Sequence, residues 1–316
     1  MATPIDTAKR IRALKQEKNV TIVAHYYQPL AVQQVADYIG DSLGLAKITQ
    51  TLAAPYILFA GVRFMAETAS ILSPEKTILL PDPRAGCPLA DFLTGDEIET
   101  FKLQYPGAPV VVYVNTTAET KAHADLCCTS SNALHIVQEA AKNWQSKTIL
   151  FGPDRHLASY IAGQTDLNII SIPGKGNCRV HNRFSIENVR AAREAHPGAP
   201  LLVHPECPAE VQKEADYIGS TSGMLQYTRD HAGTHGFIIG TENGLVDHLR
   251  WKDPSKSYYS LSKSAICGNM KLNTIDKVLA ALKAIGTEAE VTHEVRVAPD
   301  LAHQALRSIE KMLSLS

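Results

Sequence analysis

The chain has 316 residues, of which 45% are hydrophobic and 20% are charged, and its formal net charge at pH 7 is −1. This composition is typical of a globular protein, and so small a net charge provides no broad basic surface for nucleic acid or an anionic membrane. No apolar run is long enough for a transmembrane helix, and the N-terminal segment lacks the apolar stretch of a signal peptide. We therefore expect a cytoplasmic protein.

After an N-terminal helix, the chain predicts three copies of one α/β pattern. Each copy reads as strand, short helix, second helix, strand, helix, strand and cysteine. The copies begin at the apolar runs "TIVAH", "PVVVY" and "PLLVH" and end at Cys87, Cys178 and Cys267. Short aliphatic runs of this kind are typical of strands that are buried on both faces of a parallel sheet. The segment after about Thr274 is expected to form a helix, a loop and a last helix that close the structure.

The spacing of equivalent residues supports the repeat. Asp37, Asp125 and Asp216 are separated by 88 and 91 residues, and the three terminal cysteines by 91 and 89. A period near 90 residues is too long for a solenoid and suits small α/β domains. We therefore predict three homologous three-layer αβα domains with short parallel sheets, arranged about a pseudo-threefold axis. Their predicted ranges are 1–104, 105–195 and 196–316.

The same alignment places polar residues at the ends of the first strands. Ligands of open parallel sheets bind beyond the carboxyl ends of the strands. Nine candidate pocket residues recur at fixed distances from the aligned aspartates. His25, Tyr113 and His204 stand twelve residues before them, and Tyr27, Asn115 and Glu206 stand ten residues before them. Ser42, Ser130 and Thr221 stand five residues after them. The three hydroxyl residues are expected to begin helices, where they would act as N-caps alone or help to bind an anion.

Six cysteines occur, and none belongs to a CxxC pair. Cys127, Cys128 and Cys207 do not recur in the repeat, so we expect them to be buried and inert. The recurring cysteines at positions 87, 178 and 267 would meet near the axis. Three thiolates can hold zinc or an iron–sulfur cluster, and three ligands leave one iron of a cubane cluster open for Lewis-acid chemistry.

Several long motifs resemble the quinolinate synthase (NadA) family of NAD biosynthesis, and they cover nearly the whole chain. They are "AHYYQ", "GDSL", "GVRFMAE", "CPLAD", "YVNTTAE", "CTSSNA", "FGPDRHLA", "HPEC", "GSTSGM", "GTENGL" and "CGNMKLNT". The resemblance implies three α/β domains around a [4Fe–4S] cluster held by Cys87, Cys178 and Cys267. It also implies an enzyme that condenses iminoaspartate with dihydroxyacetone phosphate to give quinolinate, phosphate and water.

The resemblance also carries residue roles over to this chain. The implied substrate-binding residues are His25, Ser42, Tyr113, Val114, Asn115, Ser130, His181, His204, Pro205, Glu206 and Thr221. Proton transfers are expected from Tyr27, His25, His204 and Glu206. The upstream enzyme that produces iminoaspartate is a further expected partner, whereas nucleic acid and membranes are not.

Two other functions remain open at this point. One is a cluster-dependent hydro-lyase that acts on another small acid. The other is an iron–sulfur or zinc protein that carries electrons or senses redox state, which would require a fourth protein ligand or a centre without a substrate pocket.

Overall fold

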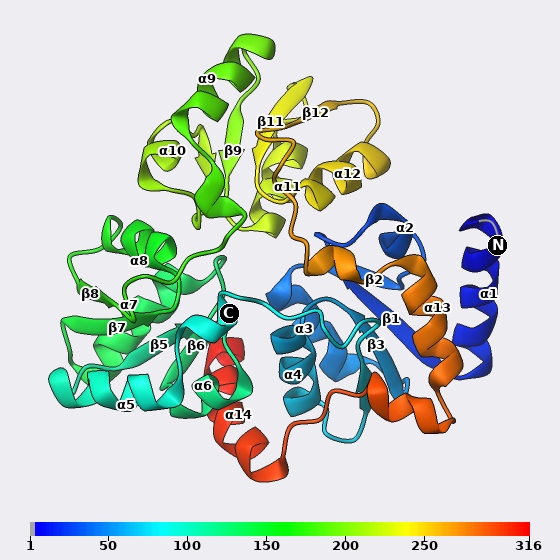
Figure 1. The fold of residues 1–316 in the computed structure, drawn as a ribbon. Coiled ribbons are helices and arrows are strands. Elements are labelled where there is room, and N and C mark those ends of the chain that lie inside the picture. The colour runs from blue at the N-terminus through cyan, green and yellow to red at the C-terminus, as the bar shows by residue number, and fades with distance from the viewer. Residues whose placement is uncertain (1–3) are drawn as a thin grey trace.

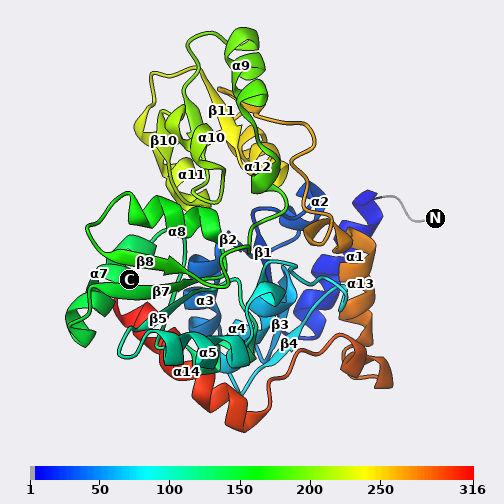
Figure 2. The ribbon, with the colours of Figure 1, turned by 60° about the vertical axis from the view of Figure 1, so that its left-hand side comes forward.

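The computed structural model describes residues 4–316, which form three parallel four-stranded sheets. In each sheet the strands lie in the order second, first, third, fourth of their unit. Figure 1 shows the three units as lobes around a common centre, and Figure 2 shows the same lobes from another side. The predicted architecture of three αβα domains is confirmed.

The first unit contains a sheet that is covered on both faces. Its strands are β1 (Val20–His25), β2 (Tyr38–Gly40), β3 (Tyr56–Ala60) and β4 (Thr77–Leu79), and its helices are α1 (Pro4–Glu17), α2 (Leu30–Gln33), α3 (Ser42–Thr51) and α4 (Arg63–Leu72). Ile22 packs with residues of α1, whereas its neighbour Val23 packs with residues of α3 and α4. Successive strand residues point to opposite faces, so both faces are buried.

The second unit repeats this arrangement. Its elements are α5 (Gly95–Gln104), β5 (Val110–Tyr113), α6 (Ala118–His123), β6 (Leu126–Cys128), α7 (Ala133–Trp144), β7 (Thr148–Gly152), α8 (Arg155–Ala162) and β8 (Asn168–Ser171). Val111 and Phe151 pack with α7 and α8 in a core that also contains residues of the first unit. Val110 and Val112 face α5 and the last helix, α14 (Pro299–Ser314).

The third unit has its own two cores. Its elements are α9 (Ile186–Ala195), β9 (Leu201–Val203), α10 (Ala209–Lys213), β10 (Tyr217–Ile218), α11 (Thr221–Asp230), β11 (Gly236–Gly240), α12 (Asn243–Lys252) and β12 (Ser257–Ser260). Leu201 and Val203 pack with α9 and α10, and Leu202 packs with α11 and α12.

A short 3-10 helix and a longer helix follow each recurring cysteine and lead to the next sheet. The 3-10 helices are η1 (Ala90–Phe92), η2 (His181–Arg183) and η3 (Met270–Leu272). The following helices are α5, α9 and α13 (Ile275–Ala284), and α13 returns to pack on α1 and β3 of the first unit. A further short 3-10 helix, η4 (Glu288–Thr292), lies between α13 and α14. The three cysteines therefore lie on the crossovers that close a ring of three units.

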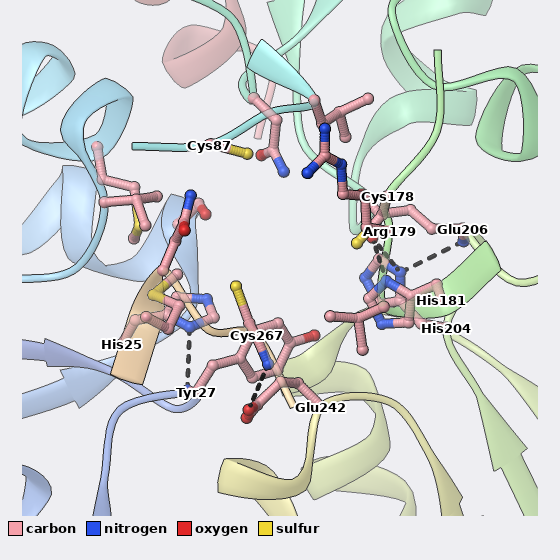
Figure 3. A pocket seen from close by; sticks show the side chains of 18 of the residues that line it. His25, Tyr27, Cys87, Cys178, Arg179, His181, His204, Glu206, Glu242 and Cys267 are labelled. Atoms are coloured by element: carbon pink, nitrogen blue, oxygen red, sulfur yellow. Dashed lines mark hydrogen bonds and ion pairs between the residues drawn. The ribbon is translucent and has the colours of Figure 1, made fainter. Parts of the chain in front are cut away.

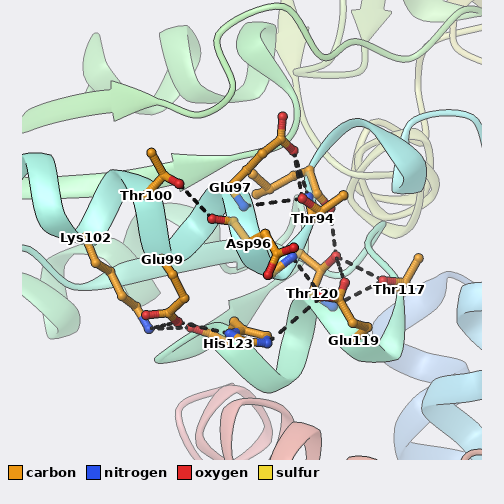
Figure 4. A network of polar contacts seen from close by, with 12 residues as sticks. Thr94, Asp96, Glu97, Glu99, Thr100, Lys102, Thr117, Glu119, Thr120 and His123 are labelled. Atoms are coloured by element: carbon orange, nitrogen blue, oxygen red, sulfur yellow. Dashed lines mark hydrogen bonds and ion pairs between the residues drawn. The ribbon is translucent and has the colours of Figure 1, made fainter.

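Polar contacts fasten α5 to the second unit (Figure 4). The Gly95 N–H donates to Glu119 Oε1 at 2.9 Å, and His123 Nδ1 lies 2.9 Å from Glu99 Oε1. The crossover helices α5 and α9 thus pack across the predicted boundaries at 104/105 and 195/196, because each covers the sheet that follows it, and α13 and α14 return to the first and second units. None of the helices formed by residues 4–316 combines the length and apolar character that crossing a bilayer requires.

Candidate active site

A cavity of ≈310 Å³ lies where the three units meet, and residues of all three line it. Every predicted site residue except Pro205 contributes to its wall. Pro205 is buried outside this lining, and its carbonyl oxygen accepts a hydrogen bond from Gln212 Nε2, so its substrate contact stays a prediction.

The three recurring cysteines face this cavity. They are free and partly exposed, and Figure 3 shows their sulfur atoms turned toward the same open space. Cys127, Cys128 and Cys207 are instead fully buried, as the sequence predicts. Burial raises the pKa of Cys87 to about 12 and raises the pKa values of Cys178 and Cys267. Thiolates would therefore form here when a bound metal compensates their charge, which fits a cysteine-ligated cluster.

Two buried carboxylates hold two of the cysteine loops. Asp154 and Glu242 begin α8 and α12 as N-caps, and both are 0% exposed. The Cys178 N–H donates to Asp154 Oδ2 at 3.0 Å, and the Cys267 N–H donates to Glu242 Oε1 at 3.1 Å. At the corresponding start of α4 stands Val62, which has no side-chain acceptor.

The Cys87 loop is held from another unit instead. Asn269, two residues after Cys267, donates its side-chain N–H to the Gly86 carbonyl at 2.8 Å. Lys271 in the same third loop lies 2.8 Å from Glu242 Oε1 and donates to the Tyr27 carbonyl at 2.6 Å. The cysteine loops are thus fixed relative to one another and to the Tyr27 segment.

The Tyr27 segment also packs closely against α12. A Cβ at Gly244 would lie only 2.8 Å from the Tyr26 carbonyl oxygen and from Tyr27 Cα, so a residue without a side chain is required there. This close approach places the Tyr27 hydroxyl between two threonines of the third unit.

Tyr27 belongs to a chain of polar contacts across the cavity wall. Its hydroxyl lies 2.6 Å from Thr241 Oγ1 and 3.0 Å from Thr221 Oγ1. Thr241 Oγ1 is also 2.8 Å from His181 Nε2. Burial raises the pKa of Tyr27 well above its ordinary value, so the phenol keeps its proton at neutral pH.

A buried glutamate and two histidines form the opposite part of the wall. Glu206 Oε2 lies 2.6 Å from His181 Nδ1 and 3.3 Å from His204 Nδ1, and the two imidazole rings stack at 4.6 Å. Burial opposes ionisation of Glu206, but the adjacent His204 and His181 outweigh it and lower its pKa. We therefore treat Glu206 as a carboxylate at neutral pH.

His25 and His204 occupy equivalent turns in two units. His25 Nδ1 accepts the Tyr27 N–H at 3.1 Å, and His204 Nδ1 accepts the Glu206 N–H at 3.3 Å. Burial lowers the pKa of His25 to about 4 and also lowers that of His204. His25 is therefore neutral, with its remaining proton on Nε2, and His204 Nε2 lies 3.1 Å from Ser130 Oγ.

The hydroxyl residues differ in part from the prediction. Ser42 and Thr221 begin α3 and α11, but the capping side chains are those of the preceding residues, Asp41 and Ser220. Ser130 precedes α7, which starts at Ala133. All three hydroxyls line the cavity, and without a capping role they are available to a ligand.

Sequence reasoning missed several residues that shape the site. Thr241 has no hydroxyl counterpart in the other units, because Val62 and Pro153 stand near the equivalent position. Asp154 and Glu242 lie inside the motifs "GPDR" and "GTENG", and their position before a helix was a usable signal for an N-cap. Lys271 could not be paired with its partners without the fold.

The fold and the cavity define a three-unit α/β protein with three cysteines around a polar pocket suited to small anions. The family model described as "Quinolinate synthetase A protein" matches residues 9–314. The quinolinate synthase of Thermococcus onnurineus (strain NA1) is 44% identical over 311 residues, covering 98% of this chain and 99% of that protein. Those of Pyrococcus abyssi (strain GE5 / Orsay) and Dehalococcoides mccartyi (strain 195) are 44% and 43% identical, covering 99% and 97% of this chain and 100% and 97% of theirs.

The chain therefore belongs to the quinolinate synthase family. The activity of this family is quinolinate synthesis in NAD biosynthesis, and its cofactor is a [4Fe–4S] cluster. The three cavity-facing cysteines fit that cofactor in number, in residue type and in their common direction.

Proposed function

We propose that this chain condenses iminoaspartate with dihydroxyacetone phosphate to form quinolinate, phosphate and two molecules of water, in the cavity between the three units. The proposal depends on one observation: three cysteines, an ionised glutamate, a protonated tyrosine and a neutral His25 line the same cavity. A redox carrier would not need these acid–base groups, and the family membership argues against a different hydro-lyase.

Cys87, Cys178 and Cys267 are the proposed ligands of the cluster. When bound, a cluster with three cysteine ligands supplies one iron that can polarise a substrate oxygen as a Lewis acid. The buried Asp154 and Glu242 keep the Cys178 and Cys267 loops in place through their backbone N–H groups.

Hydroxyl and imidazole donors would bind the anionic groups of the substrates. The helices α3 and α11 begin at the cavity, where their free N–H groups favour negative charge. Since His204 Nε2–H donates to Ser130 Oγ, the Ser130 hydroxyl proton can turn toward a carboxylate or phosphate. His25 Nε2–H is a further donor from the first unit. Tyr113, Val114 and Asn115 complete the wall in the second unit.

Proton transfers would use Tyr27 and Glu206. The condensation removes protons from carbon and nitrogen and delivers protons to the departing phosphate and water. Tyr27 holds a proton to donate, and Glu206 is a carboxylate that can accept one. Thr241 and His181 lie between them, with successive contacts of 2.6, 2.8 and 2.6 Å, so a proton can be returned along this chain. Each positioned acid or base contributes roughly 10²–10⁴ in rate.

The cysteines and the substrate indicate the compartment of the enzyme and one of its partners. Reduced cysteines fit a reducing compartment, for which we propose the cytoplasm. Iminoaspartate is an imine that hydrolyses in water, which favours direct supply by the enzyme that produces it.

The test is an anaerobic assay of the reconstituted chain with both substrates. The proposal expects a compound with the ultraviolet absorbance and mass of quinolinate, together with one phosphate per product. Turnover of a different small acid, or a reversible redox couple without product, would contradict it.

A further inference from the structure

A second set of metal-ligand atoms lies beside the three-cysteine centre and shares only one residue with it. One ligand atom each from Cys178, His181 and Glu206 lies within 4.8 Å of the other two. Cys178 and His181 lie on the crossover from the second to the third unit, and Glu206 follows β9. We propose that these three residues form a binding site for a single Zn²⁺ ion when the cluster is absent.

The donor set matches the chemistry of zinc. Thiolate sulfur, imidazole nitrogen and carboxylate oxygen are its usual ligands, and three of them leave a fourth position for water. Ligand atoms around a tetrahedral zinc ion lie roughly 3.3–3.8 Å apart, given bond lengths of about 2.0–2.3 Å. His181 Nδ1 and Glu206 Oε2 are now 2.6 Å apart, so binding requires shifts on the order of 1 Å.

A buried carboxylate oxygen in this set points to a missing cation. Glu206 Oε1 has no hydrogen-bond partner among the described residues, although the side chain is only 2% exposed. Leaving such an atom without a partner is costly, and a metal ion bound by Glu206 would satisfy it.

The other ring nitrogen of His181 is already occupied. His181 Nε2 lies 2.8 Å from Thr241 Oγ1, an outer contact that orients the ring and leaves Nδ1 for the metal. Histidine ligands of zinc commonly have such a partner on the second nitrogen.

The proposed zinc site and the cluster would exclude each other. The Cys178 thiolate can bind one of them at a time, so zinc bound here would prevent cluster assembly even while Cys87 and Cys267 stay free. This consequence depends on the proposed role of Cys178 as a cluster ligand, whereas zinc binding itself does not. The two ideas can therefore fail separately.

The test uses the full chain, freed of iron by a chelator without oxygen and then titrated with Zn²⁺ against a chromophoric competitor. We expect one zinc ion per chain and an X-ray absorption spectrum with one sulfur and otherwise nitrogen or oxygen ligands. His181→Gln and Glu206→Gln should weaken binding by more than about 100-fold, because even outer partners of a metal ligand account for roughly 10–100-fold. Cys87→Ser, Cys267→Ser and the control His25→Gln should change it less than about threefold.

Three results would overturn the proposal. They are a spectrum with three sulfur ligands, loss of zinc binding in the Cys87 and Cys267 variants with retention in His181→Gln, and no zinc binding at all. The absorption spectrum of the unaltered chain decides the matter even if a variant fails to fold. A reconstitution run with one equivalent of Zn²⁺ should also yield no cluster, and full cluster formation in its presence would refute mutual exclusion.

Discussion

Replacing Asp154 by asparagine tests how the cysteine loops are held. Asp154 Oδ1 accepts the N–H groups of His156 and Leu157 at 2.9 and 2.8 Å, and Oδ2 accepts the Cys178 N–H at 3.0 Å. An amide has one oxygen, so if it keeps capping α8, its NH₂ group faces the Cys178 N–H. A buried Cys178 N–H left without an acceptor costs about 1–3 kcal/mol, which raises local opening of this loop roughly 5- to 100-fold.

Hydrogen exchange by mass spectrometry on the apoprotein measures this opening directly. Exchange in a peptide covering residues 176–180 should accelerate by that factor in Asp154→Asn, and the reconstituted variant should lose iron faster on gel filtration. The matched control is Thr117→Ala, which removes the N-cap of α6 in the same unit, costs about 1 kcal/mol and should leave residues 176–180 unchanged. Unchanged exchange in Asp154→Asn would refute the role of this carboxylate.

Three further predictions concern the acid–base groups. Tyr27→Phe should lower kcat by roughly 10²–10⁴ with iron content unchanged, and a variant that retains full kcat would exclude Tyr27 as the acid. Thr241→Val should lower kcat by at least about tenfold with little change in KM, and Thr241→Ser should restore it; equal losses in both variants would show that the hydroxyl is not needed. Because the pKa of buried His25 is about 4, the unfolded chain binds more protons below its ordinary pKa of about 6.5. The Tm of the apoprotein should therefore fall as pH decreases from about 6.5 toward 4, less steeply in His25→Gln, and an equal slope in both would contradict this.

The sheets were predictable because they are buried on both faces. Strands such as Val110–Tyr113 consist of apolar residues whose neighbours pack into different cores, which the sequence shows as uninterrupted apolar runs. The repeat then placed His25 and His204 at equivalent strand ends, and both make the same Nδ1 contact with the backbone two residues later.

Contacts between units were not predictable from the repeat. The contact of Lys271 with Glu242 and the Tyr27 carbonyl joins residues up to 244 positions apart, and nothing in the local sequence selects these partners. Helix α13 was expected to close the structure, but its packing on α1 depends on the ring of three units. The predicted N-caps of α3 and α11 were wrong by one residue. The turn before each helix places Asp41 and Ser220 at the N-cap, one residue earlier than Ser42 and Thr221.

The most direct measurement of the central claim is an iron and sulfide count on the anaerobically reconstituted chain and its cysteine variants. If three cysteines from three units hold one cluster, the unaltered protein should contain about four iron and four sulfide per chain. The same count is expected in Cys207→Ala, whose cysteine is buried away from the cavity, and almost none in Cys87→Ala, Cys178→Ala or Cys267→Ala. A full cluster in any of these last three variants would contradict the account.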